Sequence, residues 1–244
     1  MIRPLLPALG LSVALALHPA GAARADQTDS ATFTLSLLGL TAGTLTINGK
    51  VEGNRYGVTG RLQSGGLVSM IRKISYDAEA SGRLAADRFT PSRYVEAADT
   101  GKRKTRAVMD YDRGVPQLKE YDPPRKAKAQ DIDPATQGGT VDPLTAAYAV
   151  LRDVPAEGAC TQSLDLFDGK RRTAVTLKNP RPHRNGGLMC DGEYRRVAGF
   201  DADDMAEASR FPFTLVYAPL SDGRLRVVEV AMDTIYGKGR LTRR

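Results

Sequence analysis

The sequence predicts an all-β protein, with a single, strongly curved antiparallel sheet (an open barrel or β-spiral) and one or two short helices packed against its concave face. Three observations support this fold class. Period-two alternation of polar and apolar residues recurs along residues 26–244, turn pairs such as Asp191-Gly192 punctuate it, and helical spacing is confined to two short segments. Many short strands with tight turns are typical of barrels and sandwiches, so we expect residues 26–244 to form one domain.

The first strands are the clearest. Residues 32–37, 44–47 and 55–62 alternate polar and apolar side chains, and glycine-containing turns separate them, which predicts an antiparallel meander. The same alternation predicts further strands over residues 74–80, 87–97, 103–111, 117–121, 161–167, 173–177, 189–197, 211–218 and 225–235.

Two segments have helical spacing instead. Residues 66–73 repeat apolar side chains at that spacing, and residues 142–152 do so more clearly. Asp142 is a suitable cap and Pro143 fits the first helical position. The apolar stripe that follows consists of Leu144, Ala147, Tyr148 and Leu151. We expect both helices to lie against the concave face of the sheet. Residues 122–140 contain three prolines and predict a long, mobile loop.

Residues 1–25 have the features of a cleaved secretory signal peptide. A basic Arg3 precedes an apolar run over residues 5–17, and Ala23-Arg24-Ala25 provides the small residues of a cleavage site. The apolar run is too short for a permanent membrane anchor. We therefore expect cleavage before Asp26, export to a bacterial periplasm, and a soluble mature protein that does not span the membrane.

The composition of the chain limits which binding partners and which cysteine chemistry we expect. In an oxidising compartment, Cys160 and Cys190 are expected to form one disulfide, and the C-x-x-C spacing of a redox-active pair is absent. The formal net charge is +7, with basic residues scattered along the chain, which is typical of a solvated surface. Export argues against a nucleic-acid partner. Contact with anionic lipid headgroups or acidic glycans stays open.

The sequence offers few residues in patterns that are typical of catalytic sites. Once the leader is removed, His183 is the only histidine, so we expect no metal site, no cofactor and no Ser-His-Asp arrangement. The densest acidic group, Asp201, Asp203, Asp204 and Glu207, lacks the pattern of a calcium loop and is interpreted as a solvated turn. It keeps one alternative open, which is a cell-wall-active hydrolase using paired carboxylates.

Short motifs along the chain carry a family resemblance. They are Leu38-Gly39-Leu40-Thr41-Ala42-Gly43-Thr44-Leu45, residues 65–76, Pro91-Ser92-Arg93-Tyr94, Asp142-Pro143-Leu144-Thr145-Ala146, Cys160, and Leu166-Phe167-Asp168-Gly169-Lys170-Arg171-Arg172. The chain resembles the exported proteins of domain-of-unknown-function family 3108 and is similar to the periplasmic β-spiral envelope-integrity proteins. The resemblance implies a curved antiparallel sheet wrapped around a helix, as in periplasmic lipoprotein carriers. The family has no assigned catalytic residues.

These observations predict a non-enzymatic periplasmic protein that contributes to cell-envelope maintenance. We expect it to bind either a lipid-like apolar ligand in the concavity of the sheet or a periplasmic protein partner at a sheet edge or at the loop 122–140. The residues predicted to line an apolar site are Phe33, Leu35, Leu37, Met70, Ile71, Tyr148, Phe211 and Phe213.

Overall fold

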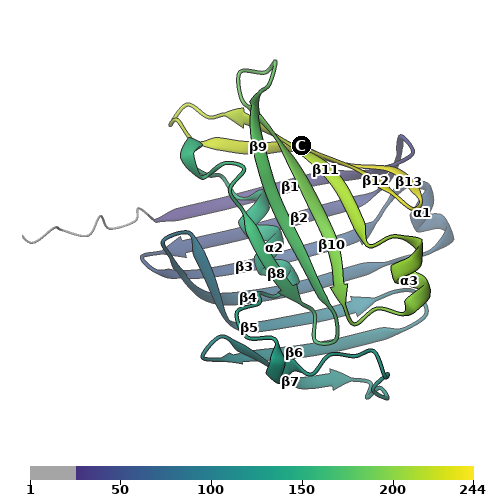
Figure 1. Ribbon diagram of the computed structural model, residues 1–244. Coiled ribbons are helices and arrows are strands. Elements are labelled where there is room, and N and C mark those ends of the chain that lie inside the picture. Colours follow the sequence, from purple (N-terminus) through teal and green to yellow (C-terminus); the bar gives the residue numbers. More distant parts are fainter. Residues whose placement is uncertain (1–25) are drawn as a thin grey trace, which may run out of the picture.

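The computed structural model describes residues 26–244, so the predicted leader lies outside the described residues. Its strands form one antiparallel sheet that curls until it nearly closes into a barrel (Figure 1), which confirms the all-β prediction. The strands are β1 (Gln27–Leu37), β2 (Leu40–Glu52), β3 (Arg55–Ser64), β4 (Ser75–Ala85), β5 (Arg88–Asp99), β6 (Lys104–Asp112), β7 (Val115–Asp122), β8 (Ser163–Phe167), β9 (Arg172–Pro182), β10 (Leu188–Ala198), β11 (Arg210–Pro219), β12 (Leu225–Thr234) and β13 (Gly237–Arg243).

The order of strands in the sheet is β7-β6-β5-β4-β3-β2-β1-β13-β12-β11-β10-β9-β8. Two meanders are therefore joined where β1 pairs with β13, with Phe33 opposite Arg243. The turn predicted at Asp191-Gly192 is wrong, because both residues lie within β10. Strand β13 is absent from the sequence prediction. It alternates glycine and basic residues around a single apolar residue, Leu241, so it lacks the apolar period that reveals the other strands.

Helix α2 (Pro143–Leu151) lies on the concave face, where it packs against β3, β4, β5 and β8 (Figure 1). This confirms the prediction for residues 142–152. Asp142 caps the helix by accepting a hydrogen bond from the Thr145 backbone N–H at 2.8 Å, and Pro143 occupies the first turn.

Helix α1 (Gly66–Ile71) corrects the second helix prediction, because it lies at one end of the sheet and packs against β2. It connects two adjacent strands, and the Ser64 N–H donates to the Ile74 carbonyl at 2.8 Å, so the connection is too short to reach the interior. The side chain of Met70 is 81% exposed. Within residues 26–244, no helix is long and apolar enough to cross a lipid bilayer.

The loop that follows β7 closes the sheet. Its Gly139 N–H donates to Gly114 O in the β6–β7 turn at 3.0 Å, and its Ile132 N–H donates to Lys170 O beside β8 at 3.1 Å. Val141 then pairs with Leu166 of β8 in parallel. Residues 131–141, which include the short helix η1 (Pro134–Thr136), therefore lie between the two edge strands. The expectation of a mobile loop is wrong for this part, since both edges hold its backbone.

Candidate functional site

The concave face of the sheet is the predicted ligand site, and helix α2 occupies it. Leu144, Tyr148 and Leu151 of α2 are buried, and Tyr148 has no exposed surface. Two glycines of the sheet allow this close approach. A Cβ atom on Gly49 would lie 2.2 Å from the Tyr148 ring, and one on Gly60 would lie 2.5 Å from Leu144 Cδ1. The helix therefore packs directly on the backbone of β2 and β3.

The start of α2 is anchored by a buried polar chain. Thr145 Oγ1 donates to Asp142 Oδ2 at 2.6 Å, and the Tyr56 hydroxyl lies 2.8 Å from Thr145 Oγ1. Burial raises the pKa of Asp142 to about 6, although the hydrogen bonds from Thr145 oppose this shift. Burial also raises the pKa of Tyr56, and the nearby Asp142 adds to that effect. The chain ties the helix to β3.

The end of α2 is anchored through Asp29 of β1. Its Oδ2 accepts a hydrogen bond from the Tyr148 hydroxyl at 2.7 Å, and its Oδ1 accepts one from the Asp153 N–H at 3.2 Å. Gln27 Nε2 donates to both carboxylate oxygens at 2.8 and 2.9 Å. Asp29 is not among the residues predicted from the sequence. The signal was present, because Asp29 shares the inward face of β1 with Ala31 and Phe33.

Two arginines complete this anchor. Arg152 is almost fully buried, its Nη2 lies 3.0 Å from Asp87 Oδ1, and its guanidinium stacks on the Phe89 ring at 5.5 Å. Arg226 on β12 forms an ion pair with the buried Asp153 at 2.6 Å, which raises the pKa of Arg226. Buried charges need such partners, since an unpaired one is costly. The arrangement fixes α2 between β1, β12 and the β4–β5 turn.

The chain beyond α2 covers the other half of the concave face. Val154 pairs with Leu225 of β12, and the chain then returns through η2 (Ala156–Gly158) towards β8. Cys160 in this return segment is bonded to Cys190 of β10, with 5.5 Å between the Cα atoms. The disulfide prediction is confirmed. In the sheet, β9 separates β8 from β10. Cys160 can still reach Cys190 of β10, because Cys160 lies in the segment before β8 and not in the strand itself.

The predicted lining residues do not form one site. Phe33 and Tyr148 belong to the packed core, Phe211 and Phe213 are buried on β11, and Leu35 and Leu37 are half-buried on β1. Met70 lies at the end of the sheet and points to solvent, which corrects its assignment to the concave face. For Ile71 the structure describes the backbone in α1 and not the side chain.

The residues considered for catalysis lie apart on the surface. His183 belongs to the β9–β10 turn, where its N–H donates to Gly187 O at 2.9 Å. The acidic group forms α3 (Ala202–Glu207) between β10 and β11, so the predicted turn is a short helix with no buried residue. Asp201, at the start of α3, is 3.6 Å from Lys128 Nζ and accepts a hydrogen bond from Gln130.

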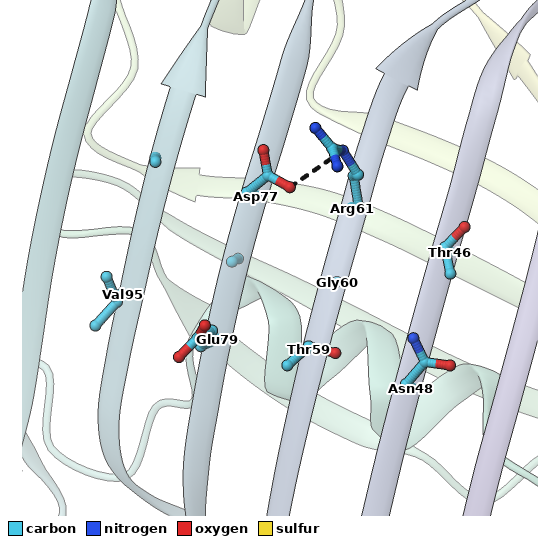
Figure 2. A pocket seen from close by; sticks show the side chains of 10 residues that line it. Thr46, Asn48, Thr59, Gly60, Arg61, Asp77, Glu79 and Val95 are labelled. Atoms are coloured by element: carbon cyan, nitrogen blue, oxygen red, sulfur yellow. Dashed lines mark ion pairs between the residues drawn. The ribbon is translucent and has the colours of Figure 1, made fainter.

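A shallow groove of about 290 Å³ lies on the outer face of β2–β5, and Figure 2 shows α2 behind the sheet in this view. Its lining is polar, with Asn48, Glu79 and an ion pair of 3.2 Å between Arg61 and Asp77. A wider recess of about 1110 Å³ opens at the end of the sheet near Gln27 and Arg224. The outer groove is separated from the interior by the sheet itself.

Fold and interior together define a barrel-like protein whose concave face is filled by its own chain, and the disulfide indicates an extracytoplasmic location. The chain belongs to the family described as "Protein of unknown function (DUF3108)", whose model matches residues 32–181. Among solved structures it is similar to a β-barrel-like protein of the domain of unknown function DUF1849 from Brucella abortus. That match has 14% identity, a TM-score of 0.48, and covers 91% of this chain and 98% of that chain. The search of curated proteins gave no match.

Proposed function

We propose that this protein is a non-catalytic periplasmic protein that contributes to cell-envelope maintenance by docking a partner on its outer surface. The observation that carries this proposal is the position of α2. An enclosed lipid-like ligand would have to displace Tyr148, which is fully buried and hydrogen-bonded to Asp29. That displacement would leave the buried Asp29 carboxylate without one of its donors, which is costly.

A periplasmic location is part of the proposal. It is supported by the Cys160–Cys190 disulfide, which persists in oxidising compartments, and by the leader features of residues 1–25. The non-catalytic character is supported by the distribution of the candidate groups. His183 and the acidic residues of α3 lie on two different turns, which join β9 to β10 and β10 to β11. Successive turns of an antiparallel meander lie at opposite ends of the sheet.

Native mass spectrometry of the protein purified from its own periplasm tests the docking proposal against the enclosed-ligand alternative. We expect the disulfide-bonded protein to appear at the mass of the bare chain, and lipid extraction of the same sample to yield no stoichiometric lipid. A stoichiometric lipid that stays bound after the outer surface is stripped by detergent would overturn the proposal in favour of a lipid carrier.

Complementation of a deletion strain tests the non-catalytic part. His183→Ala and the double variant Asp203→Asn/Asp204→Asn should both restore the wild-type envelope phenotype, because neither removes a reacting group. Thermal melting confirms that each variant is folded. A folded variant that reproduces the deletion phenotype would favour the hydrolase alternative.

A further inference from the structure

The exposed large apolar side chains of the described residues gather at one end of the sheet. Leu38 and Leu40 flank the β1–β2 turn, Met70 lies on α1, and Ile235 and Tyr236 form the β12–β13 turn. Their exposed fractions are 68%, 58%, 81%, 40% and 72%. Single exposed apolar residues are common, whereas a group of them on neighbouring turns marks an interaction site. We call these five residues the apolar tip.

The three turns of the apolar tip are in contact. The Leu38 N–H donates to Lys238 O at 2.9 Å, and a Cβ atom on Gly237 would lie 2.3 Å from Leu38 Cδ2. On the other side, the Gly65 N–H donates to Ala42 O at 2.9 Å, which holds the start of α1 against β2. Figure 1 shows α1 and the β12–β13 turn at the same end of the sheet.

Basic side chains surround the apolar tip. Lys73 follows α1, Lys238 follows the β12–β13 turn, and Lys102 lies in the β5–β6 turn. That turn is adjacent to α1, because a Cβ atom on Gly101 would lie 2.9 Å from Lys73 O. All three lysines are exposed, and among the described residues none of them forms an ion pair with a carboxylate.

Acidic groups also lie at this end of the sheet. Asp233 is exposed and lies opposite Lys238 in the β12–β13 register. The carboxylates of α3 lie at this same end, where Asp201 is 3.6 Å from Lys128 Nζ in the loop that follows β7. Asp99 at the end of β5 is likewise 3.6 Å from Lys104 Nζ, so Asp99 and Asp201 have basic partners of their own and, within residues 26–244, leave the three lysines around the apolar tip unpaired.

A groove extends from the apolar tip along the outer face of the sheet. It has a volume of about 700 Å³ and is lined by Leu38, Pro212, Ala231, Asp233, Lys238 and Arg240, among others. Leu38 and Pro212 offer apolar surface for acyl carbon and Lys238 offers a cation for a phosphate, whereas Arg240 is paired with Glu229 at 2.9 Å.

We propose that the apolar tip docks on the surface of a lipid bilayer that contains anionic lipid. The inference rests on the proposed surface-docking function and names its partner. Leu38, Met70 and Tyr236 enter the interface between headgroups and acyl chains, and the surrounding lysines contact lipid phosphates. Lysine is depleted in protein–protein interfaces and attracted by anionic leaflets, so this charge pattern favours a membrane over a protein partner.

Co-sedimentation of the full exported protein with vesicles tests this inference. We expect binding to vesicles of phosphatidylethanolamine and phosphatidylglycerol, weaker binding at high salt, and little binding to phosphatidylcholine alone. Met70→Ser/Tyr236→Ser and Lys73→Glu/Lys238→Glu should each weaken binding by about tenfold or more. The matched control is Lys178→Glu/Arg184→Glu, which changes the net charge equally at two exposed residues near the β9–β10 turn, at the opposite end, and should bind like the wild type.

Equal binding to both vesicle types, absence of binding, or equal loss in the Lys178→Glu/Arg184→Glu variant would overturn the inference. Light scattering after size exclusion adds a further check: a dimer that dissociates in Met70→Ser/Tyr236→Ser would assign the tip to a second copy of this chain and also overturn it. Failure here is distinguishable from failure of the proposed function, because an enclosed lipid is detected by mass spectrometry and not by vesicle binding.

Discussion

The Tyr148 hydroxyl donates a hydrogen bond of 2.7 Å to the Asp29 carboxylate across 119 positions of sequence. It joins the buried helix α2 to the first strand of the sheet. Because both groups are buried, the bond is formed away from water and helps to determine where the helix lies. The proposed docking of a partner on the outer surface rests on this position of α2.

Removal of this hydroxyl should loosen α2. We expect Tyr148→Phe to lower the free energy of unfolding by about 1.5–3 kcal/mol, the usual range for a hydrogen bond to a charged group. Asp29 keeps its bonds from Gln27 and the Asp153 N–H, so the fold should persist. Urea unfolding measures the change. Tyr236→Phe, at an exposed tyrosine, is the control, and equal stability of the two variants would contradict the anchoring role.

Asp142 should make stability depend on pH. Its pKa is about 6 in the folded protein and 3.8 in a model peptide, so the folded state keeps a proton that the unfolded state loses. The stability that the protonated Asp142 adds to the folded state is therefore fully present below pH 3.8 and declines as the pH rises to about 6. Above that pH, Asp142 causes no further change. Over this pH range, the free energy of unfolding falls by on the order of 3 kcal/mol.

Asp142→Asn tests this dependence, because asparagine also caps helices and does not titrate. We expect the stability of Asp142→Asn relative to the wild type to increase between about pH 4 and about pH 6. Urea unfolding across that range measures it. Asp142→Ala, which removes the cap, should be less stable than Asp142→Asn at every pH. Parallel curves for the wild type and Asp142→Asn would show that this carboxyl does not titrate with a raised pKa.

Gly49 should tolerate no side chain, because its Cα faces the Tyr148 ring. A Cβ atom there would lie 2.2 Å from that ring, whose hydroxyl is held by Asp29. We expect Gly49→Val to lower the free energy of unfolding by about 2–3 kcal/mol, as overpacking does. Gly57→Val on the neighbouring strand is the matched control, since nothing lies within 4 Å of its Cβ position. Equal effects of the two substitutions would mean that α2 does not pack on Gly49.

The elements that could be predicted from the sequence are those with a clear local residue pattern. The alternation in β1 and the cap and stripe of α2 are local, so residues 32–37 and 142–152 could be assigned without knowledge of the fold. Asp29 lies before the predicted strand 32–37, so its inward direction was not predicted. Its partners could not be inferred, because Tyr148 and Asp153 are distant in sequence and meet it only after the sheet has curled.

The elements that were missed depend on tertiary contacts. Strand β13 is stabilised by pairing on both sides, with β1 and with β12, which compensates for its glycine and arginine content. Residues 131–141 lack periodicity and are ordered by the two edge strands that they join. Met70 continues an apolar spacing in the sequence, yet its helix is confined to a tight connection between β3 and β4. Its exposure became visible only in the folded chain.

The Cys160–Cys190 disulfide should stabilise the return segment on the concave face. Cys160 lies in the chain between α2 and β8, and Cys190 is fully buried on β10. We expect Cys160→Ser to lower the free energy of unfolding by about 2–4 kcal/mol while the fold persists, because the sheet and α2 supply most of the core. Cys190→Ser should cost a similar amount, and the double variant should cost little more, since one bridge is lost in each case.

Thiol titration of the unfolded, unreduced wild type should give no free thiol, and two free thiols would contradict the bridge. Reductant should lower the melting temperature of the wild type and leave that of the double variant unchanged. An unchanged wild-type melting temperature would mean that the return segment is held by its other contacts, such as the Val154–Leu225 pair, and not by the disulfide.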